Sequence, residues 1–393
     1  MSAALPDEPF TELDRRAMTR ALELAERGAE TTHPNPRVGC VIVRGEQVIA
    51  EGWHERAGGP HAEVAALQAL RASGSSSPAD LADCTAYVTL EPCSHYGRTP
   101  PCVDALIAAR IGRVVYAIDD PNPRVAGKGA AALRAAGVRV QSGLMAPEAE
   151  EMNLGYLKWK RTGRPFVRIK MGTSLDGRVA LANGKSQWIT SEAARADVQR
   201  WRARSSAVLT GIGTVLADDP RLNVRLPGTQ RQPTRVVLDS DLRTPPTAQI
   251  LDASAPTLIF TRDKSVPTGA LAAKGVRIER IAEPIGEKTA AELGPSGGAP
   301  PRSRLDLHAV LARLGELDVN ELLVEAGPTL SGAFVQQGLA DELLLYMAPT
   351  FLGPHARALF ELPPLEDLQR ARRFRIIEQI LIGDDLRVRL RPA

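Results

Sequence analysis

Two hydrophobic periodicities alternate along the first third of the chain. Apolar side chains recur every three or four positions from residue 11 to Gly28, which is typical of an amphipathic helix ended by a glycine. Two short apolar runs, 38–43 and 47–52, flank Gly45 and predict a β-hairpin. The predicted helices that follow cover residues 62–72, 101–110 and 129–136, and the predicted strands cover 85–90, 113–118 and 138–141. This alternation predicts a layered α/β structure with helices on a mostly parallel sheet.

A second α/β pattern occupies the rest of the chain. Residues 146–162 predict a helix that ends in the breaker cluster Thr162-Gly-Arg-Pro165. We therefore expect a first domain over residues 1–145, a connector helix over 146–164 and a second domain over 165–393. The predicted strands of the second domain are 166–171, 207–210, 235–239, 257–260, 321–325 and 342–347, and its predicted helices are 191–203, 306–314 and 329–337. The stretch from Ala282 to Arg304 is rich in Gly and Pro and predicts a mobile surface loop.

Composition and charge narrow the function classes. The 393 residues are 44% hydrophobic and 24% charged, which is ordinary for a soluble protein of two or three domains. A net charge of +3 and 4% aromatic residues argue against a nucleic-acid-binding groove and favour a small anionic substrate. Neither a secretory signal nor a membrane span is expected, because the chain start has no basic and apolar leader and no run of about 18 apolar residues occurs. We expect a cytoplasmic protein.

The strongest chemical signal is a histidine followed by two later cysteines. His61-Ala-Glu63 precedes Pro92-Cys93 by about thirty residues, and Cys102 follows after eight more. One imidazole and two thiolates form a three-ligand zinc set that leaves a fourth position for water, as in catalytic sites. Zinc lowers the pKa of such a water towards about 7. Glu63 lies close enough to the metal to shuttle protons without being a ligand. The pattern matches the H-x-E and P-C parts of the zinc-deaminase signature, but eight residues separate its cysteines instead of two.

Taken singly, each of these residues also has a common structural role. A histidine at a helix start is usually a polar cap, and clustered cysteines can be buried thiols or, in a purely structural zinc site, can be joined by a fourth protein ligand. We predict that Cys40 is a buried strand residue and Cys84 a loop thiol, neither of them a ligand. The combined pattern favours a catalytic metal.

The loop between the cysteines makes the pattern specific. Thr89-Leu-Glu-Pro-Cys-Ser-His-Tyr-Gly-Arg-Thr-Pro-Pro-Cys102, with Pro34-Asn-Pro-Arg-Val-Gly-Cys40 and Gly59-Pro-His-Ala-Glu63 upstream, closely resembles the deaminase half of the RibD family of bifunctional riboflavin biosynthesis enzymes. The resemblance implies His61, Cys93 and Cys102 as zinc ligands and Glu63 as proton donor. Weaker candidates are Asn35 for the pyrimidine and His54, His95 and Arg98 for the substrate phosphate.

The second domain lacks the G-x-G-x-x-G dinucleotide fingerprint, and Gly211-Ile-Gly213 is only a fragment of it. Lys170-Met-Gly-Thr-Ser-Leu-Asp-Gly177, Ser186-Gln-Trp-Ile-Thr190, Thr210-Gly-Ile-Gly-Thr-Val-Leu-Ala-Asp-Asp-Pro220 and Val324-Glu-Ala-Gly-Pro-Thr-Leu330 resemble the reductase half of the same family. The implied architecture is a cytidine-deaminase-like three-layer α/β domain followed by a dihydrofolate-reductase-like domain. In the last motif a strand ends at Glu325 and a helix begins near Thr329, so free amides there can receive a cofactor phosphate.

The resemblance also implies the residues of the reductase site. The NADPH contacts would be Gly172, Trp188, Thr214, Asp218, Ser240, Gly327, Pro328, Thr329, Leu330, Ser331, Gly332 and Ala333. The substrate contacts would be Ser186, Arg202, Leu222, Arg225 and Glu325. The two arginines suit a phosphate, Glu325 suits sugar hydroxyls, and Lys170 and Asp218 are hypothetical helpers that stabilise the reacting nitrogen.

The implied reactions are the zinc-dependent deamination of an aminopyrimidine ribotide, 2,5-diamino-6-ribosylamino-4(3H)-pyrimidinone 5′-phosphate, and the NADPH-dependent reduction of its ribosyl group. We expect a homo-oligomer, a dimer. Two alternatives remain open: a deaminase acting on nucleic acid with a C-terminal binding module, and a deaminase joined to a degenerate or differently specific reductase.

Overall fold

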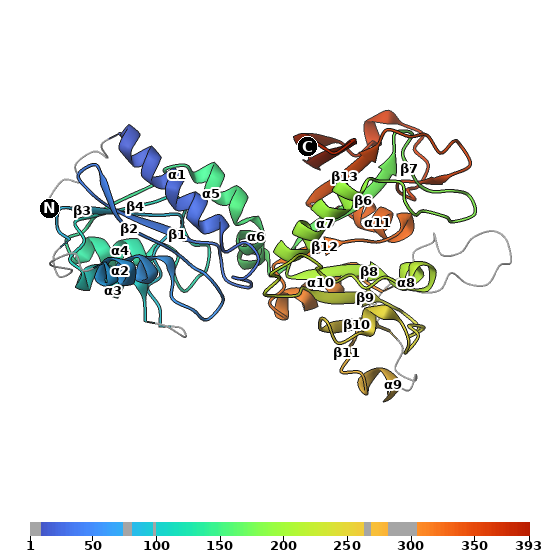
Figure 1. The fold of residues 1–393 in the computed structure, drawn as a ribbon, viewed down its shortest axis with the longest axis horizontal. Coiled ribbons are helices and arrows are strands. Elements are labelled where there is room, and N and C mark those ends of the chain that lie inside the picture. The colour runs from blue at the N-terminus through green and yellow to red at the C-terminus, as the bar shows by residue number, and fades with distance from the viewer. Residues whose placement is uncertain (1–8, 74–80, 97–99, 263–268, 282–304) are drawn as a thin grey trace. The chain divides into compact units, whose positions relative to one another are not determined.

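The computed structural model describes residues 9–73, 81–96, 100–262, 269–281 and 305–393. The chain divides into two compact units, Met1–Gly163 and Arg164–Ala393, and each is described by itself (Figure 1). Arg98 and the loop predicted between Ala282 and Arg304 lie outside the described residues. Within the described residues, every helix is too short or too polar to cross a membrane.

The N-terminal unit is built on a sheet with the strand order β2-β1-β3-β4-β5. Strand β1 pairs antiparallel with β2 and β3, whereas β3, β4 and β5 run parallel to one another. The bounds are β1 (Gly39–Arg44), β2 (Gln47–Trp53), β3 (Cys84–Val88), β4 (Arg113–Tyr116) and β5 (Arg139–Ser142). The predicted hairpin and the predicted parallel strands are therefore present.

Helices cover both faces of this sheet, which gives the three layers expected from the sequence. Helices α1 (Glu12–Glu26) and α5 (Ala146–Met152) lie on one face, and α2 (Ala62–Ala72), α3 (Cys102–Ala108) and α4 (Lys128–Ala135) lie on the other (Figure 1). Cys40 is a fully buried residue of β1, as predicted. The prediction of Cys84 as a loop thiol was wrong: Cys84 is buried and begins β3, where it pairs with Arg44 of β1.

The first helix is fixed to the sheet by its own N-terminal cap. Thr11 and Asp14 form a capping box, in which each side chain accepts a hydrogen bond from the other residue's backbone N–H. The Asp14 carboxylate also accepts hydrogen bonds of 2.7 Å from the Tyr87 hydroxyl and from Arg113, residues of β3 and β4. The same residue therefore starts the helix and attaches it to the core.

The connector differs from the predicted single helix over residues 146–162. It consists of α5 and a second helix, α6 (Leu154–Thr162), which are separated at Asn153. Asn153 has φ −111° and ψ 20°, outside the helical region, and its side chain bonds to the backbone of Arg37. A tertiary contact thus interrupts a sequence whose local pattern is helical throughout.

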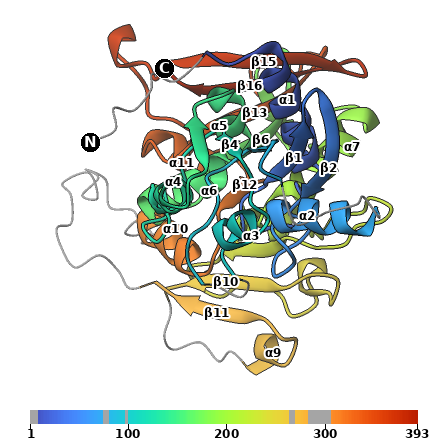
Figure 2. The ribbon, with the colours of Figure 1, turned by 90° about the vertical axis from the view of Figure 1, so that its left-hand side faces the viewer.

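The C-terminal unit contains a larger sheet with the order β11-β10-β9-β8-β12-β6-β13-β16-β15. Its strands run parallel from β11 to β13, and the final hairpin pairs antiparallel with β13. The strands are β6 (Phe166–Ser174), β8 (Ala207–Gly211), β9 (Thr234–Leu238), β10 (Thr257–Thr261), β11 (Arg277–Arg280), β12 (Glu321–Val324), β13 (Glu342–Ala348), β15 (Phe374–Ile382) and β16 (Asp385–Pro392). Figure 2 shows β15 and β16 along one edge of this unit, with β11 at the opposite edge.

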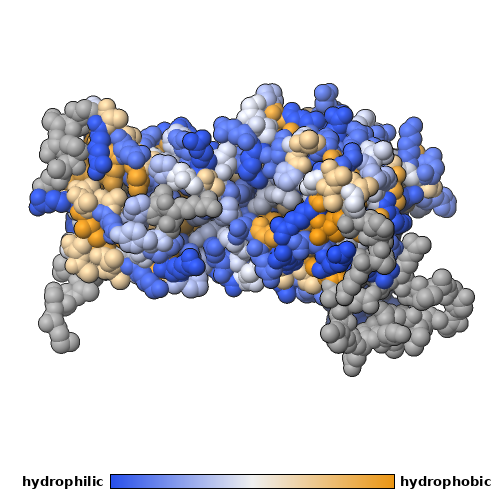
Figure 3. Space-filling view, turned by 90° about the horizontal axis from the view of Figure 1, so that it is seen from below, coloured by the Kyte–Doolittle hydropathy of each residue, from blue (hydrophilic) through white to orange (hydrophobic). Residues whose placement is uncertain are grey.

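Smaller elements complete the C-terminal unit. A short pair is formed by β7 (Arg178–Ala180) and β14 (Arg357–Ala358). The helices are α7 (Glu192–Arg204), α8 (Ile212–Asp218), α9 (Gly269–Ala272), α10 (Leu307–Glu316) and α11 (Pro328–Gln336), with one-turn 3₁₀ helices η1 (Gln249–Leu251) and η3 (Leu368–Arg370). Two clusters of buried apolar side chains form the core of this unit. On the surface seen in Figure 3, hydrophilic residues cover most of both units.

The C-terminal hairpin was not among the predicted strands. Its signal was present, because the β-branched run from Phe374 to Ile382 is followed by a Gly-Asp turn and by an alternation of arginine with apolar residues. One face of this hairpin forms a buried ion-pair network with the rest of the sheet. Glu342 is fully buried and pairs with Arg168 at 2.5 Å, Arg389 at 2.8 Å and Arg391 at 2.9 Å.

We predict that Glu342→Ala destabilises the C-terminal unit by about 3–5 kcal/mol, because it leaves the buried Arg168 and the half-buried Arg389 and Arg391 without their shared partner. The melting temperature of this unit should fall by on the order of 10 °C in calorimetry. Glu316→Ala is the matched control: it breaks the exposed Arg313–Glu316 pair and should cost less than about 0.5 kcal/mol. Equal shifts for the two variants would contradict the prediction.

The same network gives the stability a definite dependence on pH. Burial acts to raise the pKa of Glu342, but the positive charges of Arg168 and Arg389 hold it well below its ordinary value. A carboxylate with a depressed folded-state pKa contributes its full stabilisation above its unfolded pKa of about 4.3. That contribution is lost as the pH falls through the folded-state pKa, and Glu342→Ala should remove this part of the acid sensitivity.

Candidate active sites

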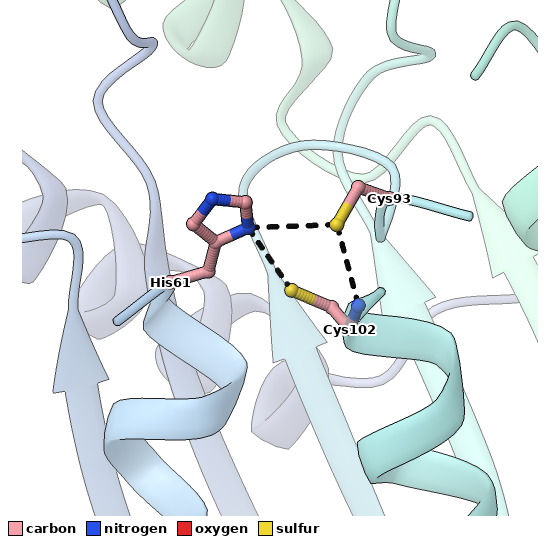
Figure 4. Close-up of side chains that lie close together, drawn as sticks. All are labelled: His61, Cys93 and Cys102. Atoms are coloured by element: carbon pink, nitrogen blue, oxygen red, sulfur yellow. Dashed lines mark hydrogen bonds between the residues drawn. The ribbon is translucent and has the colours of Figure 1, made fainter. Parts of the chain in front are cut away.

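The residues predicted to bind zinc come from three different elements and meet at one point (Figure 4). His61 is the N-cap of α2, Cys93 lies in the loop after β3, and Cys102 is the first residue of α3. The imidazole Nδ1 lies 3.2 Å from the Cys102 Sγ and 3.5 Å from the Cys93 Sγ. All three ligand atoms lie within 4.8 Å of one another.

This donor set suits a tetrahedral zinc ion with one position left open. Within the part of the chain that the structure describes, the cluster comprises one nitrogen and two sulfur donors and has no fourth protein ligand. The backbone N–H of Cys102, at the start of α3, donates a hydrogen bond of 3.3 Å to the Cys93 Sγ. The hydrogen bond from the Cys102 side chain, with that of His61, lowers the pKa of Cys93 to about 4. The site thus favours the thiolate form of Cys93, whereas the hydrogen bond to Cys93, together with burial, raises the pKa of Cys102.

Glu63 is the second residue of α2 and is 3% exposed. Burial, together with the negative charge of Cys93, raises the pKa of Glu63 to about 7. A carboxyl group with a pKa near neutrality both accepts and releases a proton at working pH, which is what acid–base catalysis requires.

Two of the weaker candidates lie beside the cluster. The His54 ring contacts the His61 ring edge-on at a centroid distance of 5.3 Å. Its Nε2 lies 3.0 Å from the Asn35 Nδ2, and its Nδ1 lies 2.9 Å from the Pro60 carbonyl oxygen. The predicted phosphate role of His54 does not fit, because this ring is buried and both nitrogens are already used. His95 has a buried Nδ1 with no hydrogen-bond partner.

Glu91 is a residue of this site whose role the sequence did not reveal. It is 3% exposed, and its carboxylate accepts hydrogen bonds from the backbone N–H groups of Gly127 at 2.9 Å and Ala130 at 3.1 Å. These bonds tie the segment before Cys93 to the start of α4. In the sequence, Glu91 is a glutamate directly after an apolar strand. Glutamate side chains are usually exposed to solvent, so this position did not stand out as a buried residue.

The predicted reductase residues gather around one cavity of about 1450 Å³ in the C-terminal unit. This exceeds the roughly 300–1,000 Å³ of sites for drug-sized ligands, so the cavity has room for more than one small molecule. The predicted residues that line it are Gly172, Ser186, Trp188, Arg202, Thr214, Asp218, Leu222, Arg225, Ser240, Glu325, Gly327, Pro328, Thr329, Leu330 and Ala333.

Two of the predicted cofactor contacts lie away from this cavity. Ser331 and Gly332 do not line the cavity. Ser331 is buried and its hydroxyl points to the Ala326 carbonyl and the Met171 sulfur, while a Cβ at Gly332 would lie 2.4 Å from the Glu361 carbonyl oxygen. Ser331 therefore faces the core, whereas Gly332 is covered by the backbone of Glu361.

A charge network forms one wall of the cavity. Glu325 follows β12 and makes a bidentate ion pair with Arg202 of α7, at 2.5 Å and 3.0 Å. Lys170 of β6 lies 4.0 Å from the same carboxylate, and burial lowers the pKa of Lys170. Arg225 has no carboxylate partner among the described residues and donates to the Asn223 amide oxygen. Arg225 is therefore the better phosphate ligand of the two predicted arginines.

The turn between β12 and α11 supplies backbone donors to the same cavity. Gly327 is the N-cap of α11 and Pro328 is its first residue. The free N–H groups of the first turn therefore belong to Thr329 and Leu330, which line the cavity. This arrangement suits a phosphate group.

Comparisons with known proteins agree with both halves. Residues 11–118 match the family model "Cytidine and deoxycytidylate deaminase zinc-binding region", and residues 165–382 match "RibD C-terminal domain". The zinc-binding match supports zinc, and the C-terminal match implies a nicotinamide cofactor. It identifies the C-terminal unit as a reductase domain and gives no support to a nucleic-acid-binding module.

Relatives align along nearly the whole chain. The riboflavin biosynthesis protein RibD of Escherichia coli is 47% identical over 385 residues, which cover 95% of this chain and 98% of that protein. The solved structure of Acinetobacter baumannii RibD has a TM-score of 0.85 and 44% identity, covering 97% of this chain and 99% of that one. A Thermotoga maritima structure, a diaminohydroxyphosphoribosylaminopyrimidine deaminase/5-amino-6-(5-phosphoribosylamino)uracil reductase, has a TM-score of 0.81 and 30% identity, covering 97% and 99%. The chain belongs to the RibD family of riboflavin biosynthesis proteins, bifunctional enzymes that join a deaminase to a reductase.

Proposed function

We propose that the N-terminal unit deaminates 2,5-diamino-6-ribosylamino-4(3H)-pyrimidinone 5′-phosphate. The C-terminal unit then reduces the ribosyl group with NADPH, giving 5-amino-6-(5-phosphoribitylamino)uracil. The observation that carries the first step is the buried Glu63 on the same helix start as His61, beside the two cysteine sulfurs. The relative whose name describes this pair of reactions, the Thermotoga maritima protein, aligns with both units.

In the deaminase site, His61, Cys93 and Cys102 would hold the zinc ion. Zinc, when bound, acidifies a water molecule so that it can attack the ring carbon that carries the amino group. The Glu63 carboxylate accepts one proton from the water and gives it to the ring nitrogen. It then takes the remaining proton of the added hydroxyl and gives it to the amino group, which leaves as ammonia. Because Glu63 is shielded from solvent, these protons stay within the site.

In the reductase site, the reacting bond is the C1=N bond of the open-chain imine form of the ribosylamine. NADPH supplies the hydride that adds to C1, and the nitrogen gains a proton to become an amine. Lys170 is the nearest cation to Glu325 after Arg202 and is a suitable proton donor, because burial lowers its pKa. The Glu325 carboxylate, which is held by Arg202, accepts hydrogen bonds from the sugar hydroxyls. Arg225 binds the phosphate. Asp218 lines the cavity as a second candidate for stabilising charge on nitrogen.

The preference for NADPH over NADH is supported by the turn after β9, two strands from the phosphate-binding turn after β12. Adjacent strands lie about 4.8 Å apart, so the two turns are separated by about 10 Å. Dinucleotide sites specific for NADH place an acid near the ribose, whereas an arginine accommodates the extra 2′-phosphate. Here Asp239 is buried and bonds to Thr244, and Asp241 pairs with Arg262 at 2.8 Å. Ser240 and Arg243 line the cavity instead.

We predict that Arg243→Gln weakens NADPH binding by roughly 10- to 100-fold, since a charge-assisted hydrogen bond to the 2′-phosphate is lost. NADH binding should change by less than about twofold, and titration calorimetry with NADPH, NADH and 2′,5′-ADP measures the difference. Arg200→Gln removes an equal charge from the exposed side of α7 and serves as control. An equal loss of affinity for NADPH and NADH would contradict the assignment.

The proposed assembly is a homodimer in the cytoplasm. Strand β15 is the edge of its sheet and carries Ile376 and Leu381 with 60% and 75% of their surface exposed. Apolar side chains on an unpaired edge favour association with a second copy. Sedimentation at micromolar concentration tests the dimer, and a monomer would contradict it.

The cysteines bear on the cellular compartment. All four are free thiols, which suits a reducing compartment.

A coupled assay tests the whole function. The purified chain should release ammonia from the diaminopyrimidine ribotide without NADPH, and should oxidise NADPH only after that release. Ammonia release without any NADPH oxidation would instead support a degenerate or differently specific reductase.

A further inference from the structure

The loop that carries Asn35 is fastened from outside the deaminase motifs. Asn153, between α5 and α6, is 3% exposed. Its Oδ1 accepts a hydrogen bond from the Arg37 backbone N–H at 2.9 Å, and its Nδ2 donates to the Arg37 backbone oxygen at 2.9 Å. The Arg37 guanidinium donates to the Met152 carbonyl oxygen, also at 2.9 Å. Three hydrogen bonds therefore join this loop to the connector.

The same loop continues directly into the metal cluster. The Pro60 carbonyl can only accept, so the Nδ1 of His54 carries the proton of that 2.9 Å bond. The Nε2 of His54 is then an acceptor and receives the amide N–H of Asn35. Pro60 precedes the ligand His61, and the rings of His54 and His61 touch.

This chain of bonds settles which end of the Asn35 amide is left for a ligand. Its nitrogen is used by His54, and no donor among the described residues bonds its Oδ1. A free carbonyl oxygen beside the cluster accepts a hydrogen bond from an N–H group of a ligand. An aminopyrimidine carries such groups on its ring and on its exocyclic nitrogens.

We propose that Asn153 is a positioning residue of the deaminase: by fixing the backbone of Arg37 it holds the Asn35 carbonyl where it binds the pyrimidine. This inference rests on the proposed deamination. The connector helices are then a working part of the deaminase site, although their sequence lies beyond the zinc motifs. The role concerns substrate binding, because the side chain of Asn153 hydrogen-bonds to Arg37 and not to Glu63 or the predicted metal ligands.

The test compares Asn153→Ala and Asn153→Asp with the wild-type chain. Alanine removes both side-chain bonds, and aspartate cannot donate to the Arg37 oxygen. Loss of one substrate hydrogen bond should raise the KM of deamination roughly three- to tenfold in both variants, with kcat changed by less than about twofold. Zinc content and NADPH-dependent reduction on the same chain should match the wild type.

Gln141→Ala is the matched control. It removes two hydrogen bonds, of 2.9 Å and 2.5 Å, that Arg113 makes to β5 of the same unit. It should lower the melting temperature without changing KM. A merely structural role for Asn153 would give this same result, with a smaller active fraction and an unchanged KM.

Hydrogen exchange supplies a readout that needs no substrate. In Asn153→Ala the amide of Arg37 should exchange at least about tenfold faster, while amides around Cys102 keep their wild-type rates. An unchanged KM at full zinc content, or unchanged exchange at Arg37, would overturn the inference. If the wild-type chain releases no ammonia from the ribotide, the proposed function fails, and the exchange result still decides whether Asn153 holds the loop.

Discussion

Glu63→Gln should lower the rate of ammonia release by about 10²- to 10⁴-fold, the usual contribution of a positioned acid–base group. Glutamine keeps the size and a hydrogen-bonding end, but it cannot take a proton from water. Because Glu63 is not one of the three clustered donors, zinc content should remain at the wild-type level. Ammonia release is measured with the ribotide, and zinc by atomic absorption.

The control for this prediction is Glu46→Gln, an exposed residue of the β1–β2 turn. It should leave both activities unchanged. NADPH-dependent reduction by the Glu63→Gln chain, measured with deaminated ribotide, should equal that of the wild type. Normal deamination by this variant would remove Glu63 from the proton-shuttle role, and loss of zinc would show that its part is structural.

Glu325→Gln should reduce kcat/KM of the reductase by roughly 10²-fold or more. The substitution leaves the buried Arg202 without its bidentate carboxylate and Lys170 without its nearest anion. Glutamine also removes the charged acceptor for the sugar hydroxyls. A hydrogen bond to a charged group contributes about 1.5–3 kcal/mol, and every 1.4 kcal/mol corresponds to a factor of ten. Steady-state oxidation of NADPH with the deaminated ribotide measures the effect.

Deamination by the same variant should be unchanged, because Glu325 belongs to the other compact unit. Glu316→Gln, an exposed glutamate at the end of α10, controls for the loss of one negative charge. A reductase that keeps more than about half of its activity in Glu325→Gln would rule out the proposed sugar-binding role and would reduce the Arg202–Glu325 pair to a packing contact.

The spacing of apolar residues located most helices and strands, because each of these elements has its own repeating pattern within a short segment. Helix α2 has the predicted bounds, 62–72, and α7, α10 and α11 differ from prediction by one or two residues. Two errors fall where a distant residue outweighs the local pattern, whereas the C-terminal hairpin was missed although its local signal was present. Asn153 breaks a helical run by bonding to Arg37, more than a hundred positions earlier, and Cys84 pairs with Arg44 instead of lying in a loop.

The candidate sites divide in the same way. His61, Cys93 and Cys102 could be chosen from the sequence, because metal ligands need particular atoms and the motifs spell out those residue types. Side-chain direction could not be read from a motif. Ser331 and Gly332 match the family pattern, yet Ser331 faces the core and Gly332 is covered by the backbone of Glu361. His54 was a candidate phosphate ligand from the sequence, but in the folded chain both of its ring nitrogens already have hydrogen-bond partners.

By itself the sequence determined the two α/β units, the metal-binding residue types and the family, since these depend on local spacing and on residue chemistry. Only the tertiary structure decided which polar and charged groups pair with one another. These pairs are Arg202 with Glu325, Glu342 with its arginines, and Asn153 with Arg37. Hydrogen bonds and ion pairs act over about 3 Å in space and take no account of separation along the chain, so partners far apart in sequence become visible only when the chain is folded.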